Sequence, residues 1–174
     1  DVYKRQRWSR KVVDVDDRIT VIVAQNPPRA VSGWHHHGEN RACVYVQQGT
    51  VRLEWGPAGR ESAELSAGDF YVILPHTVHR EANPASADQV LIALAVGPAP
   101  KFFEVEGAEA GGAGSIRVIR TGEVPAGPPT AGVERKVADV DEVVSVGGAR
   151  IGPGSFSAWH HHGDGTVCAY VAQG

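Results

Sequence analysis

Apolar and polar residues alternate along much of the first hundred positions, as in residues 50–55, TVRLEW. Successive side chains of a strand point to opposite faces, so this period of two predicts β-strands with one buried face. No stretch shows helical periodicity, and Gly, Pro and Asp divide the pattern into short pieces, which favours a sandwich or a barrel. Strands are expected at residues 11–16, 19–25, 29–37, 42–48, 50–55, 61–66, 69–75, 77–82 and 89–96.

The chain also contains an internal repeat. A shift of 125 positions aligns residues 10–49 with residues 135–174 without a gap, and 20 of these 40 positions are identical. Such self-similarity predicts two copies of one structural unit. The second copy stops at Gly174 and the chain has no methionine, so we expect a fragment of a longer protein. The first six residues, DVYKRQ, have no counterpart in the second copy and resemble adaptor read-through.

Composition changes between the two copies. Residues 97–134 hold much of the glycine and proline of the chain, which is typical of a linker, with one strand expected at residues 115–120. We therefore expect a complete β-domain at residues 10–97, a linker at residues 98–134, and the first half of a second domain at residues 135–174.

Bulk composition excludes several classes of protein. Hydrophobic residues make up 42% of the chain and charged residues 21%, which indicates a globular domain rather than a disordered one. The net charge of −3 predicts no nucleic-acid partner and no anionic membrane surface as a partner. No apolar run is long enough for a membrane span. A cytoplasmic protein is the expectation, and a homo-oligomer is compatible with it.

Histidines are concentrated rather than scattered. All eight lie in three short segments, at residues 35–37, at residues 76 and 79, and at residues 160–162. In a strand, His35 and His37 share one face while His36 points to the other. Two imidazoles on one face can share one metal ion, and His79 is the candidate third ligand. His36 and His76 are expected to lie outside the site. Imidazole suits iron, zinc, copper, nickel and manganese to differing degrees.

Two segments carry a family resemblance. Residues 33–49, GWHHHGENRACVYVQQG, resemble the first cupin motif, and residues 68–83, GDFYVILPHTVHREAN, resemble the second. The resemblance implies an all-β fold, a cupin double-stranded β-helix or jelly-roll barrel, closed around a metal in its mouth. It maps His35, His37 and His79 onto metal-binding positions. With the repeat, it implies a bicupin whose second cupin is truncated.

One position departs from the cupin pattern. The first motif usually supplies a glutamate ligand seven residues before its closing glycine, where the two copies have Ala42 and Val167. Three neutral imidazoles leave the charge of a divalent ion uncompensated, which favours an anionic ligand. Glu39 follows the histidine pair and is the candidate catalytic or substrate-contacting residue. Glu81, beside His79, is expected at a solvated rim.

The resemblance leaves three functions open. A metal-dependent dioxygenase acting on a small anionic or enolisable molecule comes first, because all-histidine sites resemble those of thiol and diketone dioxygenases. Iron(II) is the favoured divalent metal, and manganese, zinc and nickel are alternatives. A manganese- or zinc-dependent isomerase comes next. A non-catalytic module that binds or senses a small molecule is the competing class, because fold alone does not decide function.

Overall fold

A computed structural model describes residues 9–110, 114–128, 130 and 132–174. The expectation for residues 1–6 lies outside the described residues. The chain divides into two compact units, residues 1–123 and residues 124–174. Each unit is described by itself.

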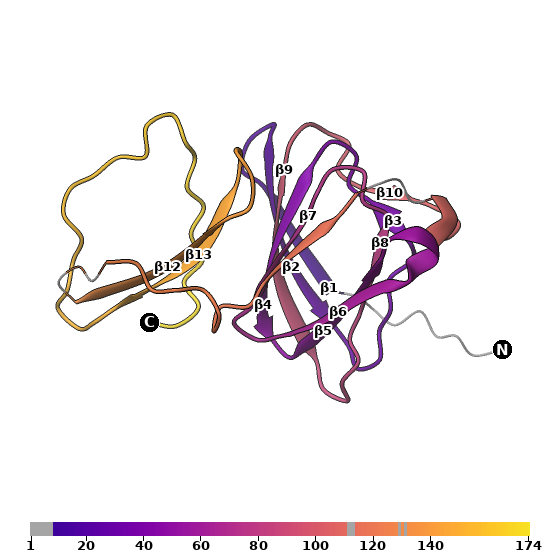
Figure 1. Cartoon of the computed structure of the whole chain (residues 1–174), viewed down its shortest axis with the longest axis horizontal. Coiled ribbons are helices and arrows are strands. Elements are labelled where there is room, and N and C mark those ends of the chain that lie inside the picture. Colours follow the sequence, from indigo (N-terminus) through magenta and orange to yellow (C-terminus); the bar gives the residue numbers. More distant parts are fainter. Residues whose placement is uncertain (1–8, 111–113, 129, 131) are drawn as a thin grey trace. The chain divides into compact units, whose positions relative to one another are not determined.

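The first unit consists of two antiparallel sheets (Figure 1). The six-stranded sheet has the order β1 (Ser9–Asp14), β2 (Ile19–Asn26), β9 (Gln89–Val96), β4 (Arg41–Gln48), β7 (Phe70–Ile73) and β11 (Ile116–Ile119). The five-stranded sheet has the order β10 (Phe103–Glu104), β3 (His35–His36), β8 (His79–Ala82), β5 (Thr50–Trp55) and β6 (Glu61–Ser66). Two short 3-10 turns complete the unit, η1 (Pro57–Gly59) and η2 (Ala108–Ala110).

The apolar core lies between the inner faces of these sheets. On β4, Ala42, Val44 and Val46 are buried while the residues between them are more exposed. The same alternation on β5 buries the side chains of Val51, Leu53 and Trp55. The core cluster joins these residues to the inner residues of four further strands, which are Leu65, Tyr71, Ile73, Leu91 and Ile116. Period-two patterning therefore directs one apolar face of each strand into a shared interior.

Most of the expected strands are confirmed, but residues 29–37 are not one continuous strand. The only strand there is β3, and pairing with β8 is confined to His35 and to an isolated bridge between Val31 and Ala82. Two prolines precede the segment, and Arg29 has a positive φ of 62°. A proline lacks the N–H that a ladder needs, and a left-handed residue interrupts an extended chain, so the ladder forms only in pieces.

The expectation of a closed barrel is wrong. The two sheets face each other as separate sheets, and their edge strands, β1 and β11 in one and β10 and β6 in the other, each pair on one side only. The jelly-roll arrangement is retained without a continuous hydrogen-bonded ring.

Residues 98–123 add strands to both sheets. β10 pairs with β3, so that Phe103 lies opposite His36, and β11 pairs with β7. The strand expected at residues 115–120 is thus confirmed as β11, whereas β10 was not expected because its neighbours are glycine- and proline-rich. This part of the predicted linker is integrated into the two sheets.

The second unit repeats the first hairpin in detail. β12 (Val133–Asp139) pairs with β13 (Ser145–Ile151), and the 125-position shift carries the register of β1 with β2 onto it: Asp14 opposite Thr20 becomes Asp139 opposite Ser145. In both copies the hydroxyl group donates a hydrogen bond to that aspartate, at 2.7 Å and 2.6 Å. Over this hairpin the sequence repeat is therefore also a structural repeat.

Residues 152–174 form turns and irregular structure. Across the described residues, none of the helical segments has the length and apolar character needed to span a membrane.

Candidate metal centre

Three histidines meet between the two sheets of the first unit. His35 on β3 pairs directly with His79 on β8, and His37 follows β3. Ring centroids are 4.2 Å apart for His35 and His79, and 5.2 Å apart for His37 and each of the other two. The candidate ligand nitrogens all lie within 4.8 Å of one another. These three histidines, which we call the histidine cluster, could hold one metal ion.

Backbone carbonyls fix the tautomer of each ring. The Nδ1 atom of His35 lies 2.9 Å from the carbonyl oxygen of Gly33, that of His37 lies 2.8 Å from the carbonyl of Lys101, and that of His79 lies 2.9 Å from the carbonyl of Thr77. A carbonyl can only accept a hydrogen bond, so Nδ1 carries the proton and Nε2 keeps its lone pair. This partnership of imidazole and carbonyl is the usual support of a metal-binding histidine.

Burial disfavours the charged forms of His37 and His79. His35 is 3% exposed and His79 is fully buried. Burial lowers the pKa of His79 well below its usual value, and the nearby His35 and His37 lower it further. Burial also lowers the pKa of His37. Neutral imidazole is the form that binds metal, so the fold holds these groups ready for it.

One buried nitrogen of the cluster has no hydrogen-bond partner in the described part of the chain, as expected of a metal ligand. The Nε2 atom of His79 is buried and has no hydrogen-bond partner among the described residues. An unpaired polar atom in an interior costs free energy unless a ligand satisfies it. A metal ion would supply that partner, and the three Nε2 lone pairs are the donors that first-row divalent ions accept.

Phe102 covers part of the cluster. Its ring stacks on His35 with a centroid distance of 4.6 Å and an interplanar angle of 30°, and lies 6.2 Å from the ring of His37. Sequence reasoning missed this residue, and also the Lys101 carbonyl beside it, because both lie in the segment interpreted as a linker. The pairing of β10 with β3 carries them to the site.

Comparison with known proteins identifies the domain. Residues 22–96 match the family model described as a cupin domain. The segment belongs to the cupin family. Among curated proteins, no match to the sequence was found.

Solved structures share the cupin fold at low sequence identity. An uncharacterised conserved protein with a double-stranded β-helix domain from Klebsiella pneumoniae is 20% identical with a TM-score of 0.53, over 59% of this chain and 88% of that chain. Oxalate oxidase in complex with the substrate analogue glycolate is 15% identical with a TM-score of 0.52, over 59% of this chain and 57% of that chain. Lactobacillus farciminis oxalate decarboxylase, in a formate complex, is 16% identical with a TM-score of 0.52, over 59% and 32%. At these identities the likeness shows the fold alone.

Asn83, which ends the second cupin motif, has a structural role. Its Nδ2 group donates hydrogen bonds to the carbonyl oxygens of Asn26, Pro27 and Ala87. Its Oδ1 atom accepts a hydrogen bond from the backbone N–H of Ala85. The buried amide thus ties the loop that follows β8 to the end of β2.

The sequence suggested that Glu81 lies at a solvated rim, but the structure places it elsewhere. It lies opposite Leu53, a core residue, in the pairing of β5 with β8, on the same face of β8 as His79. Its Oε1 atom accepts a hydrogen bond of 2.5 Å from the hydroxyl of Tyr71, which is fully buried. The signal was present in the sequence, because residues two apart on a strand share a face. Arg80, between them, points outward to Glu54.

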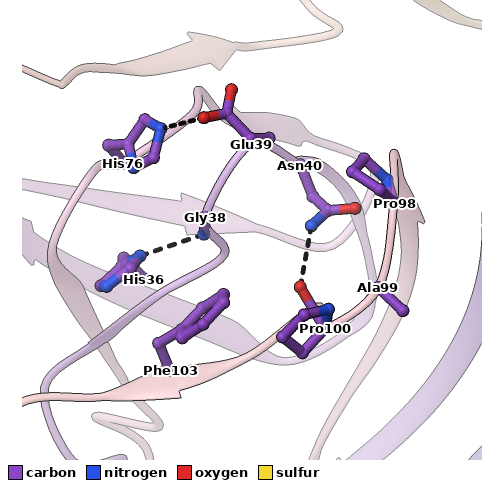
Figure 2. Close-up of a pocket in the computed structure, with 9 residues that line it drawn as sticks. All are labelled: His36, Gly38, Glu39, Asn40, His76, Pro98, Ala99, Pro100 and Phe103. Atoms are coloured by element: carbon purple, nitrogen blue, oxygen red, sulfur yellow. Dashed lines mark hydrogen bonds and ion pairs between the residues drawn. The ribbon is translucent and has the colours of Figure 1, made fainter.

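A separate pocket of about 310 Å³ lies on the side of β3 that carries His36 (Figure 2). Its lining consists of His36, Gly38, Glu39, Asn40, His76, Pro98, Ala99, Pro100 and Phe103, and we call it the outer pocket. None of the three cluster histidines lines it. His36 stacks on Phe103 with an interplanar angle of 5° and a centroid distance of 4.9 Å.

The outer pocket contains the candidate catalytic residue Glu39. Its carboxylate lies 2.9 Å from Nε2 of His76, and its side chain is 71% exposed (Figure 2). Gly38 turns the chain there with a φ of +59° and donates its N–H to Nδ1 of His36. A Cβ at that glycine would lie 2.7 Å from the ring of Phe103, so no larger residue fits without a shift. The structure therefore brings Glu39 to His76 and not to the histidine cluster.

The second copy of the histidine triplet repeats the local geometry of the first. The Nδ1 atom of His160 lies 2.9 Å from the carbonyl of Ala158, and the rings of His160 and His162 are 5.0 Å apart. These side chains are exposed. Within the part of the chain that the structure describes, no third histidine, cysteine or carboxylate joins them in a metal-sized cluster.

Proposed function

We propose that the cupin domain binds one divalent metal ion through His35, His37 and His79 and acts on a small anionic molecule at that ion. The observation that carries the proposal is the common support of the three rings. Each Nδ1 is held by a backbone carbonyl, and the ligand nitrogens gather within 4.8 Å. Three protein ligands leave positions open for a small molecule, as catalytic sites require.

Charge favours an anionic ligand. The cluster contributes three neutral imidazoles, and Ala42 stands where the first cupin motif usually has a glutamate ligand. A divalent ion there keeps most of its positive charge and attracts a carboxylate or an enolate. Two proteins of similar fold, oxalate oxidase and oxalate decarboxylase, were solved with glycolate and with formate. Both of these ligands are small carboxylates, which is consistent with an anionic ligand here.

Iron(II) is the first candidate metal and oxidation by O₂ the first candidate reaction. When bound, iron(II) supplies a centre at which O₂ and an electron-rich ligand can react together. A dioxygenase places both atoms of O₂ in its product, so the reaction needs no external reductant. The chain contributes the three imidazoles that orient the ion, the Phe102 ring that shields His35 from water, and the half-buried Glu81 beside the cluster.

Metal analysis tests this proposal directly. The full chain, purified without a histidine tag, is expected to retain one equivalent of metal after dialysis, with iron(II) restoring it to the stripped protein. Oxygen uptake by the iron form with small carboxylates or diketones would support the dioxygenase. Ligand binding without oxygen uptake would instead favour the non-catalytic binding module, and a chain that retains no metal would refute the proposal.

A further inference from the structure

The carboxylate of Glu81 points into the space beside the histidine cluster. Its position opposite Leu53 places it on the inner face of β8, two residues after His79. The proximity is also electrostatic, because the charge of Glu81 acts on His37 in the direction that raises its pKa. Both Glu81 and His37 are half-buried, whereas His35 and His79 are buried. Of these four residues, Glu81 and His37 are therefore the more accessible to a ligand.

Tyr71 holds this carboxylate from the opposite sheet. The Tyr71 hydroxyl, on β7, donates to Oε1 of Glu81 on β8, so the contact crosses the sandwich. Burial raises the pKa of Tyr71 well above its usual value, and the negative charge of Glu81 raises it further. The phenol therefore remains a hydrogen-bond donor. The second oxygen of Glu81, Oε2, has no hydrogen-bond partner among the described residues. Glu81 thus presents a fixed acceptor toward the site.

A fixed carboxylate discriminates between ligands according to the chemical group of the ligand that lies beside it. A hydroxyl group would donate a charge-assisted hydrogen bond to Oε2, which contributes about 1.5–3 kcal/mol. A second carboxylate would bring two like charges together in a partly desolvated space, which is unfavourable. The ligand needs one anionic group for the metal and one hydrogen-bond donor for Glu81.

We propose that Glu81 determines specificity, so that the cupin domain selects small monocarboxylates with a neighbouring hydroxyl group over dicarboxylates such as oxalate. This inference rests on the proposed function, because the metal must hold the carboxylate of the ligand. It distinguishes this chain from the solved relatives named for oxalate, which share only its fold.

The test compares glycolate with oxalate on the manganese-loaded full chain. Calorimetry gives the Kd of each ligand for the wild type and for Glu81→Gln, with retention of the metal verified after each titration. Glutamine keeps the shape of the side chain and removes its charge. Glu61→Gln is the matched control, because it makes the same charge change on an exposed residue of β6. The ratio of the Kd for oxalate to the Kd for glycolate cancels effects common to both ligands.

We expect Glu81→Gln to lower that ratio at least about tenfold, which corresponds to about 1.4 kcal/mol, while Glu61→Gln leaves it unchanged. If Glu81→Gln does not fold, Tyr71→Phe, which releases the carboxylate from its donor, is expected to lower the ratio about threefold or more. A folded variant with the wild-type ratio would overturn the inference and leave the metal site standing. Wild-type protein that retains no manganese or other divalent ion would overturn both proposals.

Discussion

His35 and His79 lie directly opposite each other in the antiparallel pairing of β3 with β8, and their ring centroids are 4.2 Å apart. Residues opposite each other in a ladder project from the same face of the sheet. The backbone pairing therefore brings a ligand from the second cupin motif to the pair supplied by the first. Strand pairing and backbone carbonyls together therefore position the rings.

Replacing His79 with glutamine is expected to abolish tight metal binding and to leave the fold intact. Loss of only the hydrogen-bond partner of a metal ligand lowers metal affinity by up to about 100-fold. The variant loses one of the three ligand nitrogens themselves, so its metal affinity should fall by at least that much. The far-UV circular dichroism should match the wild type, because apolar burial and not the ion supplies most of the stability. Metal content after dialysis, measured beside circular dichroism, checks both points.

His36→Gln is the matched control for that variant. It changes the same type of residue on β3, the strand that pairs with β8, but on the side that stacks on Phe103. It should retain a full equivalent of metal. Equal loss in both variants, or full retention in the His79 variant, would contradict the assignment of the cluster.

Acid should destabilise the metal-free protein, starting near pH 6.5. Burial lowers the pKa of His37 and His79 in the folded state below the value of about 6.5 that holds in the unfolded chain. Below pH 6.5 the unfolded chain takes up protons that the folded chain does not. Stability is therefore fully present above pH 6.5, falls as the pH drops, and levels off below the folded-state pKa. The slope reaches about 1.4 kcal/mol per pH unit for each such proton.

Urea unfolding in the presence of a chelator measures this dependence between pH 7.5 and about pH 5.5, where carboxylates contribute little. His79→Gln removes the most strongly shifted group and should show a shallower slope than the wild type. Identical slopes for the two proteins over this range would show that burial of His79 does not control the acid response.

Alternation in the sequence predicted most of the strands, and together with the cupin resemblance it pointed to the three histidines of the cluster, but it did not predict the surroundings of the cluster. Period-two patterning predicts the apolar faces of β4 and β5, and the same rule separates His35 and His37 from His36. The rule also places Glu81 on the face of His79, yet its charge and its arginine neighbour favoured a solvated position. Its half-buried position became apparent only from Tyr71, which reaches it from the other sheet.

Contacts between distant segments were beyond any local pattern. Phe102 lies in a stretch whose prolines and glycines are typical of a linker, and it is brought to His35 by the short pairing of β10 with β3. Glu39 is separated from the cluster by the turn at Gly38, which directs its carboxylate to His76. Such positions depend on the long-range pairing of strands, which a single sequence does not encode in its periodicity.

Phe102 is expected to slow exchange of the metal. Its ring covers one side of His35 and is 42% exposed, so Phe102→Ala opens the cluster to water without creating a fully buried cavity. Release of the metal to an excess of chelator, followed by stopped flow, should become several-fold faster. Phe103→Ala is the control, because that ring stacks on His36 and not on the cluster. A release rate that is unchanged in Phe102→Ala, or raised equally in Phe103→Ala, would exclude a shielding role.

The full chain should bind one metal ion tightly and not two, although the histidine triplet occurs twice. His160 and His162 reproduce the ring spacing of the first copy, at 5.0 Å, but they are exposed, and no third ligand joins them in the described residues. Two imidazoles in water bind a divalent ion far more weakly than three that are buried and held by carbonyls, because the chain must order them on binding. Titration with manganese(II) or iron(II) should reach one tight equivalent per chain, which His35→Ala removes and His160→Ala leaves unchanged. Two equivalent tight sites, or a tight site lost on changing His160, would contradict the assignment of the tight site to the first copy.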